Sequence, residues 1–154
     1  MHLNIFEAKK LKIAIIQAKF YPEITDALKI ASVEKLVEYG INRDEIQIFI
    51  VPGTFEISLA AKKAAQSGSF DAVICLGAVI KGDILNFDYI SQAVTAGIIQ
   101  ATLETEIPIL YGIIVASTLE LASKYTQPDE LNKGYEAANA AIEMIKICEV
   151  LDEI

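Results

Sequence analysis

Short apolar runs alternate along the chain with longer segments in which apolar residues recur at helical spacing. The four apolar runs predict β-strands, and they cover residues 11–18, 47–51, 72–77 and 109–115. The run at 72–77 contains no polar position, which is typical of a strand that is covered on both faces of a parallel sheet.

The segments of helical spacing predict four longer helices and one short helix. The longer ones cover residues 24–39, 55–67, 86–105 and 132–150. Pro22 suits the start of the first helix and Gly40 its end. The third, which Asn86 opens, is expected to be the longest. Residues 117–120 form a capping box, in which Ser117 is the expected cap of the short helix.

This alternation of strands and helices predicts an α/β protein. A strand that returns to the same sheet through a helix makes a right-handed crossover, so the order favours a four-stranded, mostly parallel sheet between two helix layers. We expect this three-layer sandwich to be a single domain over residues 1–154, with residues 1–10 as an N-terminal arm. Ligands of such sheets bind beyond the carboxyl ends of the strands, so the loops that follow the strands are the candidate sites.

Composition narrows the classes of function. The chain is 53% hydrophobic, which is rich for 154 residues and favours large interfaces with other copies of itself. The formal net charge of -8 argues against nucleic acid and against an anionic membrane surface as partners. No apolar run reaches the roughly 18 residues that are needed to span a bilayer.

The first ten residues are polar and lack a signal-peptide core, so we expect a cytoplasmic protein. The two cysteines, Cys75 and Cys148, are expected to be free thiols. They lie in separate elements, and the single histidine, His2, lies in the arm. We therefore expect no metal site.

Two of the loops after the strands carry residues that suit ligand binding. Phe20 follows the first strand, where its ring could stack on a planar group, although an aromatic residue there is also a common core plug. Pro52, Gly53 and Thr54 follow the second strand and turn into a helix whose first amides are free to donate. Glu56, in the first turn of that helix, is explained equally well by the helix dipole.

Several segments carry a resemblance to an enzyme family. They are IAIIQAKF at 13–20, VPGTFEISLAAKK at 51–63, FDAVICLGAVIKG at 70–82, FDYIS at 87–91 and NKGYEAANAAIEM at 132–144. In order and spacing, the chain resembles the 6,7-dimethyl-8-ribityllumazine synthase family of riboflavin biosynthesis, whose fold is flavodoxin-like. The resemblance implies that 5-amino-6-(D-ribitylamino)uracil and 3,4-dihydroxy-2-butanone 4-phosphate condense to the lumazine with loss of phosphate. It implies no metal or redox cofactor, since the enzyme mostly holds two reactive molecules together.

The resemblance also implies roles for individual residues. Phe20 would stack on the uracil ring, and Thr54, Phe55 and Glu56 would hold the ribityl chain, with Glu56 accepting from a hydroxyl. Backbone groups of Ala78, Val79 and Ile80 would lie beside the pyrimidine. Tyr111 would close the site of the neighbouring subunit, and Lys133 would lie near the phosphate.

Four positions depart from the family pattern, and all fall in the half of the site that handles phosphate and protons. Asn86 stands in place of a proton-shuttling histidine, and Ile84 in place of a phosphate-binding threonine. Asp83 adds a negative charge, and Tyr125 stands in place of a phosphate-binding arginine. Loss of a general base typically costs about 10²–10⁴-fold in rate. Asn86 nevertheless suits the fold, because asparagine is a favoured helix N-cap.

These departures leave two main hypotheses open. In the first, the protein is a lumazine synthase, a transferase, whose phosphate handling is impaired or rewired and whose rate rests on proximity. In the second, it is a non-catalytic relative that binds a flavin-like or pyrimidine ligand or serves as an assembly scaffold. A different reaction in the same site is a further alternative.

The resemblance implies that the main macromolecular partner is another copy of the chain. Members of the family form homopentamers with sites between adjacent subunits, and some build icosahedral shells of 60 subunits. Residues 4–6 resemble the arm that adds a strand to a neighbour's sheet. We therefore expect a homopentamer, and the sequence leaves open whether pentamers build a shell.

Overall fold

The computed structural model describes residues 10–82 and 85–154, in which the chain forms a four-stranded parallel sheet. The strands are β1 (Ile13–Ala18), β2 (Ile46–Val51), β3 (Ala72–Ile80) and β4 (Ile109–Ala116). Their order across the sheet is β2-β1-β3-β4, and every neighbouring pair runs parallel. This is the order of a flavodoxin-like sheet, which confirms the predicted α/β class.

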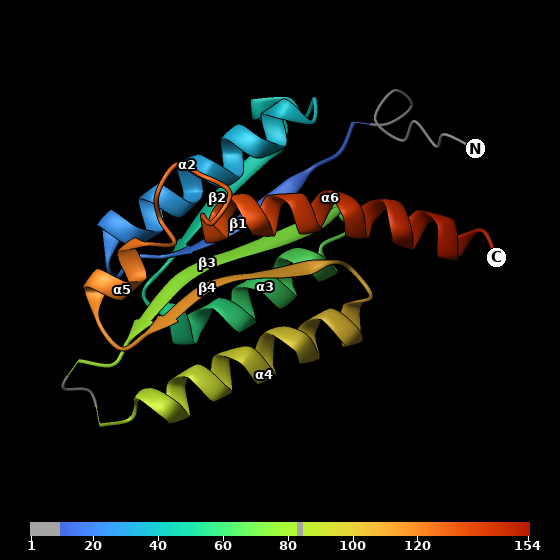
Figure 1. The fold of residues 1–154 in the computed structure, drawn as a ribbon. Coiled ribbons are helices and arrows are strands. Elements are labelled where there is room, and N and C mark those ends of the chain that lie inside the picture. Colours follow the sequence, from blue (N-terminus) through green and yellow to red (C-terminus); the bar gives the residue numbers. More distant parts are fainter. Residues whose placement is uncertain (1–9, 83–84) are drawn as a thin grey trace.

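Helices cover both faces of the sheet, so the fold has the three predicted layers (Figure 1). One face packs against α2 (Pro22–Glu38), α5 (Leu119–Ser123) and α6 (Lys133–Asp152). The other face packs against α3 (Ile57–Gln66) and α4 (Phe87–Thr105). Two single-turn 3-10 helices precede β2 and α3, and they are η1 (Arg43–Glu45) and η2 (Thr54–Glu56).

The two faces have separate cores because neighbouring residues of a strand point to opposite sides. In β1, Ile13 and Ile15 pack on the α2 side, whereas Ala14 and Ile16 pack on the α3 side. Every residue of β1 and β3 is buried, as predicted for strands covered on both faces.

At the sheet edge, β2 leaves apolar side chains open, and Ile50 is 58% exposed. Such an edge can accept a further strand. The arm that the sequence predicts to add one, residues 4–6, lies outside the described residues.

The predicted end of β3 at Gly77 is wrong. The strand continues to Ile80, because residues 78–80 pair with residues 114–116 of β4. Gly77 does not break the strand. It makes room for the neighbouring turn, since a methyl group added there would lie 2.9 Å from Thr54 Oγ1. The residues that were expected in the loop after the third strand are therefore its last residues.

Two details of the helices also differ from expectation. The cap of α5 is Thr118 rather than Ser117, and Thr118 Oγ1 accepts a hydrogen bond from the Leu121 amide at 3.1 Å. The reason is that β4 runs on to Ala116, which moves the start of the helix along the chain. The longest of the described helices is α6, with 20 residues against 19 in α4. No helix within residues 10–82 or 85–154 is long and apolar enough to cross a membrane.

The two cysteines differ in accessibility. Cys75 is fully buried in β3, and burial raises the pKa of its thiol above the ordinary range, whereas Cys148 on α6 is half-buried. Because the thiolate is the reactive form, we expect iodoacetamide to label Cys148 alone in the native protein and both cysteines after denaturation. Mass spectrometry of the labelled protein checks this. Rapid labelling of native Cys75 would contradict the expectation.

Candidate functional site

A pocket of about 520 Å³ lies at the carboxyl end of the sheet. It opens between the β1–α2 turn, η2 and the end of β3, which is where a parallel sheet of this type is expected to bind a ligand. Its wall is mostly apolar, and the lining residues are Phe20, Tyr21, Gly53, Thr54, Phe55, Glu56, Ala78, Val79, Ile80 and Ile90.

The β1–α2 turn places Phe20 at the mouth of this pocket. β1 ends at Ala18, and the Lys19 amide donates to the Val51 carbonyl at 2.8 Å, which holds the end of β1 against β2. Phe20 follows, and its side chain is 67% exposed in the single chain. The alternative that Phe20 plugs the core is therefore wrong. An exposed ring at a strand end is free to stack on a planar ligand.

The Phe20 ring and the Glu56 carboxylate both lie close to Gly53. A methyl group added at Gly53 would lie 3.1 Å from Glu56 Oε2 and 3.2 Å from Phe20 Cδ2. A side chain at this position would make the Phe20 ring or the Glu56 carboxylate shift by a few tenths of an ångström. One ligand can therefore meet the ring with its face and the carboxylate with a hydroxyl group.

Thr54 anchors η2 to the sheet. It is 7% exposed, and its Oγ1 donates to the Ala78 carbonyl at 3.0 Å. Because a hydroxyl has only one proton, this bond leaves Thr54 none for a ligand. Its side chain can act towards a ligand only as an acceptor, and its main effect is to fix the position of Phe55 and Glu56 beside it.

The end of β3 projects beyond β1 on the pocket side. β1 pairs with β3 only as far as Leu76, whereas β4 pairs with it as far as Ile80. On the β1 side, residues 78–80 therefore form a strand edge without a neighbouring strand, and Thr54 occupies only the Ala78 carbonyl. Such an edge presents backbone donors and acceptors that can pair with the amide-like edge of a heterocycle.

The lining carries little charge. In the described part of the chain, Glu56 and Tyr21 are its ionisable residues, and it includes no histidine, lysine or arginine. The pocket thus offers an aromatic face, a carboxylate and a backbone edge. This set suits an uncharged planar heterocycle with a hydroxylated chain, and it provides no cation for a phosphate group.

The sequence pattern of the 6,7-dimethyl-8-ribityllumazine synthase family matches residues 10–149. The chain belongs to this family. The match runs from the start of β1 to the last turns of α6, so it covers every element that forms the pocket.

The structure brings together the residues that the family resemblance assigned to the pyrimidine and the ribityl chain. Those that line the pocket are Phe20, Thr54, Phe55, Glu56, Ala78, Val79 and Ile80. Two others, Asp83 and Ile84, lie outside the described residues. The remaining four are not part of the lining, and they are Asn86, Tyr111, Tyr125 and Lys133.

Asn86 stands at the start of α4 but does not cap it. Its side chain is exposed and makes no capping hydrogen bond, so the prediction that Asn86 serves as a side-chain N-cap is wrong. Its backbone dihedrals, φ −101° and ψ 20°, lie outside the extended conformation typical of a capping residue. One turn later Ile90 lines the pocket, and positions four apart share a helix face. Residue 86 therefore lies one turn before a pocket residue, and its side chain makes no hydrogen bond with any residue in 10–82 or 85–154.

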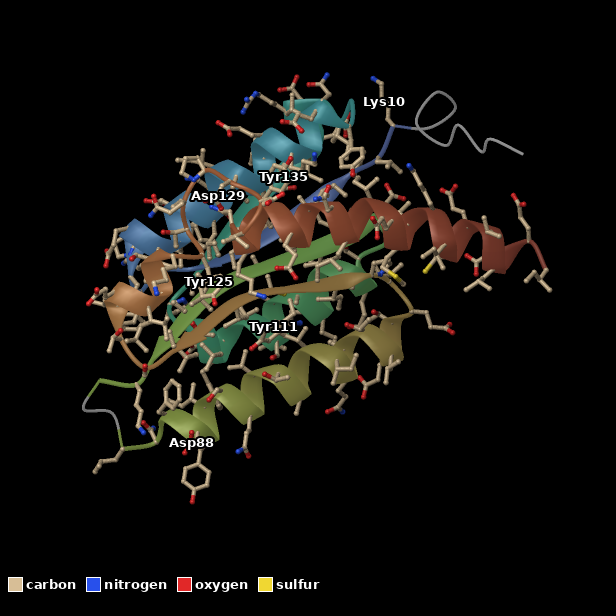
Figure 2. All side chains as sticks on the ribbon, viewed as in Figure 1. Lys10, Asp88, Tyr111, Tyr125, Asp129 and Tyr135 are labelled. Atoms are coloured by element: carbon tan, nitrogen blue, oxygen red, sulfur yellow. The ribbon has the colours of Figure 1, made fainter. Side chains whose placement is uncertain are left out.

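Tyr111 lies away from the pocket of its own chain. It is near the start of β4, and a hydrogen bond of 3.2 Å joins its hydroxyl to Thr95 Oγ1 on α4. Figure 2 shows it between β4 and α4, far from the carboxyl end of the sheet. Its side chain is 38% exposed in the single chain.

Tyr125 lies in the connection between α5 and α6 (Figure 2), and Lys133 is the first residue of α6. The Lys133 amide donates to the Tyr125 carbonyl at 2.9 Å, so the two positions are fixed to each other. Lys133 Nζ lies 3.3 Å from Glu136 Oε2 within α6. The tyrosine side chain is partly exposed, and the structure gives neither residue a contact with the pocket.

Sequence reasoning missed Tyr21 and Ile90 as pocket residues. Ile90 belongs to the apolar stripe of α4, which predicts a core position and does not mark the end of the stripe that reaches the pocket. Tyr21 follows Phe20 directly, and its place in the lining depends on a backbone conformation that no periodic pattern signals.

Proposed function

We propose that the chain is a lumazine synthase that binds 5-amino-6-(D-ribitylamino)uracil in this pocket and condenses it with 3,4-dihydroxy-2-butanone 4-phosphate. The observation that carries the proposal is that the Phe20 ring and the Glu56 carboxylate line the same pocket, both next to Gly53. A ribitylaminopyrimidine has the matching parts, since its ring can stack and its chain hydroxyls can donate to a carboxylate.

In this proposal each part of the pocket holds one part of the substrate. Phe20 packs on the pyrimidine face, and the edge of residues 78–80 pairs with the ring carbonyl and N–H groups. Glu56 accepts from a ribityl hydroxyl. The amine is then held in one orientation beside the ketone. Because the translational and rotational entropy of the two substrates is already lost on binding, it no longer adds to the barrier of the reaction.

The chemistry requires an amine–ketone condensation, release of phosphate and ring closure. Asn86 cannot exchange protons near neutral pH, and the described pocket lining contains no other base than Glu56. The proposed rate therefore comes mostly from proximity, with water carrying the protons. Phosphate binding falls to groups outside the lining, for which Lys81, Lys124 and Lys133 are the candidates.

We further propose that the working form is a homopentamer with its sites between adjacent subunits, in the cytoplasm. Support comes from α4, on which large apolar side chains are exposed in the single chain, among them Tyr89, Ile99 and Leu103. Helix surfaces of this composition are typical of interfaces between copies. Tyr111 would close the site of a neighbouring subunit.

A second candidate function is ligand binding without turnover, with a pyrimidine or flavin-like ligand, or a role as an assembly scaffold. It is favoured by one observation, namely that the described pocket keeps its ring-binding half and lacks a cationic group and an imidazole. The two functions share the ligand site and differ only in the chemical step.

A turnover assay with both substrates, followed by lumazine absorbance, tests the proposal. We expect product formation above the uncatalysed rate, and a fall of roughly tenfold or more in kcat/KM for Phe20→Ala, because base–aromatic stacking contributes about 1–3 kcal/mol. Ile30→Ala on α2, an exposed residue outside this pocket, serves as the control and should match the wild type.

The assay separates the two candidate functions. No turnover, together with tight binding of the lumazine that Phe20→Ala weakens, would favour the non-catalytic function. Neither turnover nor binding by the assembled protein would contradict both.

A further inference from the structure

Tyr21, beside Phe20 in the β1–α2 turn, has an unusual backbone conformation. Its φ of 56° and ψ of 59° place it in the left-handed helical region. Glycine and asparagine enter this region readily, whereas a bulky side chain there is an outlier. The residue also precedes Pro22, which restricts its backbone further. A tyrosine at this position therefore requires an explanation.

Hydrogen bonds hold the conformation, and they do so without the tyrosine side chain. The Tyr21 carbonyl accepts from the amides of Ile24 at 2.9 Å and Thr25 at 3.0 Å, and from Thr25 Oγ1 at 3.4 Å. Gln17 Nε2 supports this turn by donating to Asp26 Oδ1 at 2.8 Å and to Thr25 Oγ1 at 3.3 Å. Any residue at position 21 could make the same carbonyl bonds, so the turn does not explain the tyrosine.

The side chain of Tyr21 lies where a ligand would meet it. It is half-buried against the core of the α2 side and lines the same pocket as Phe20. Its hydroxyl makes no hydrogen bond with any residue in 10–82 or 85–154. The other hydroxyl of the lining, on Thr54, already donates to Ala78. Of the described lining side chains, only Tyr21 thus offers an unused hydrogen-bond donor.

We propose that Tyr21 determines ligand specificity: its ring forms a second aromatic wall beside Phe20, and its hydroxyl donates to an acceptor atom of a pyrimidine-derived heterocycle. This inference rests on the proposed function, because it takes the same pocket as the ligand site. A donor in an otherwise apolar wall discriminates strongly against rings that lack the matching acceptor. The strained backbone fits this role, since strain of this kind collects at ligand sites.

The experiment compares wild type, Tyr21→Phe, Tyr21→Asn and Phe20→Ala in a titration with 6,7-dimethyl-8-ribityllumazine, whose own fluorescence reports binding. Thermal unfolding of each variant is measured alongside. We expect Tyr21→Phe to weaken binding roughly tenfold, since a buried acceptor loses its donor, with an unchanged thermal midpoint. Tyr21→Asn should weaken it at least as much and should not lower the midpoint, because asparagine tolerates the left-handed backbone.

The outcomes separate this inference from the function on which it rests. Wild-type affinity in both Tyr21 variants, with weak binding by Phe20→Ala, would overturn the role of Tyr21 and leave the ligand pocket in place. A thermal midpoint that falls in Tyr21→Phe along with the affinity would also overturn it, because the hydroxyl would then be structural. Absence of binding by the wild type would overturn the proposed function and, with it, this inference.

Discussion

Replacing Gly134 with alanine is expected to destabilise the fold strongly. Gly134 lies in the first turn of α6, where the backbone of α2 passes directly against it, and a methyl group added there would meet the Leu28 carbonyl group, 2.7 Å from its carbon atom. Alanine normally favours a helix over glycine by about 1 kcal/mol. Here the opposing atoms belong to backbone, which cannot rotate away, so the two helices must separate.

The expected loss is about 3 kcal/mol or more, which is large against a total stability of about 5–15 kcal/mol. Urea unfolding followed by circular dichroism measures it. Ser32→Ala is the matched control, because it removes the hydrogen bond from Ser32 Oγ to the Gly134 carbonyl at 2.7 Å without adding volume, and it should cost only about 1 kcal/mol. A Gly134→Ala protein as stable as the wild type would contradict the close approach of α2 and α6.

That contact illustrates which parts of the fold the sequence could predict. The alternation of apolar runs and helical segments predicted the order of elements, the parallel sheet and its two covered faces. It could not identify Gly134 as a helix-crossing point, because the contact joins segments about a hundred residues apart. The end of β3 was missed for a similar reason, since residues 78–80 extend the strand by pairing with residues 114–116 of β4, a separate segment of the chain.

The candidate site was predictable to the extent that it follows from topology. Strand ends of a parallel sheet must meet at one edge, so Phe20 and Glu56 were expected near the same edge, and both line the pocket there. That both lie next to Gly53 depends on how the two loops pack, which no local sequence pattern predicts. The backbone of Tyr21 and the unengaged side chain of Asn86 break local rules of propensity. Such violations tend to fall at functional positions, where local patterns predict least.

The double variant Asn86→His/Tyr125→Arg is expected to raise kcat/KM by about 10²-fold or more, since a general base contributes about 10²–10⁴-fold. Asn86 is exposed, lies one turn before the pocket residue Ile90, and makes no capping bond that a histidine would lose. Tyr125 is 38% exposed, so an arginine there keeps its charge in water until a phosphate pairs with its planar fork. The two substitutions should therefore add a general base and a phosphate-binding cation with little loss of stability.

The pH dependence of the reaction identifies the source of any gain. A histidine base titrates near pH 6.5, so the Asn86→His proteins should gain activity as the pH rises through about 6.5, and the wild type should show no such step. Asn86→Gln and Tyr125→Lys are the controls, because the first cannot titrate near neutrality and the second supplies a charge without the bidentate geometry. An unchanged rate and a flat pH profile in the double variant would mean that residue 86 does not reach the reacting atoms. Any difference in activity from the rest of the family would then come from a different site geometry and not from the side chains at positions 86 and 125.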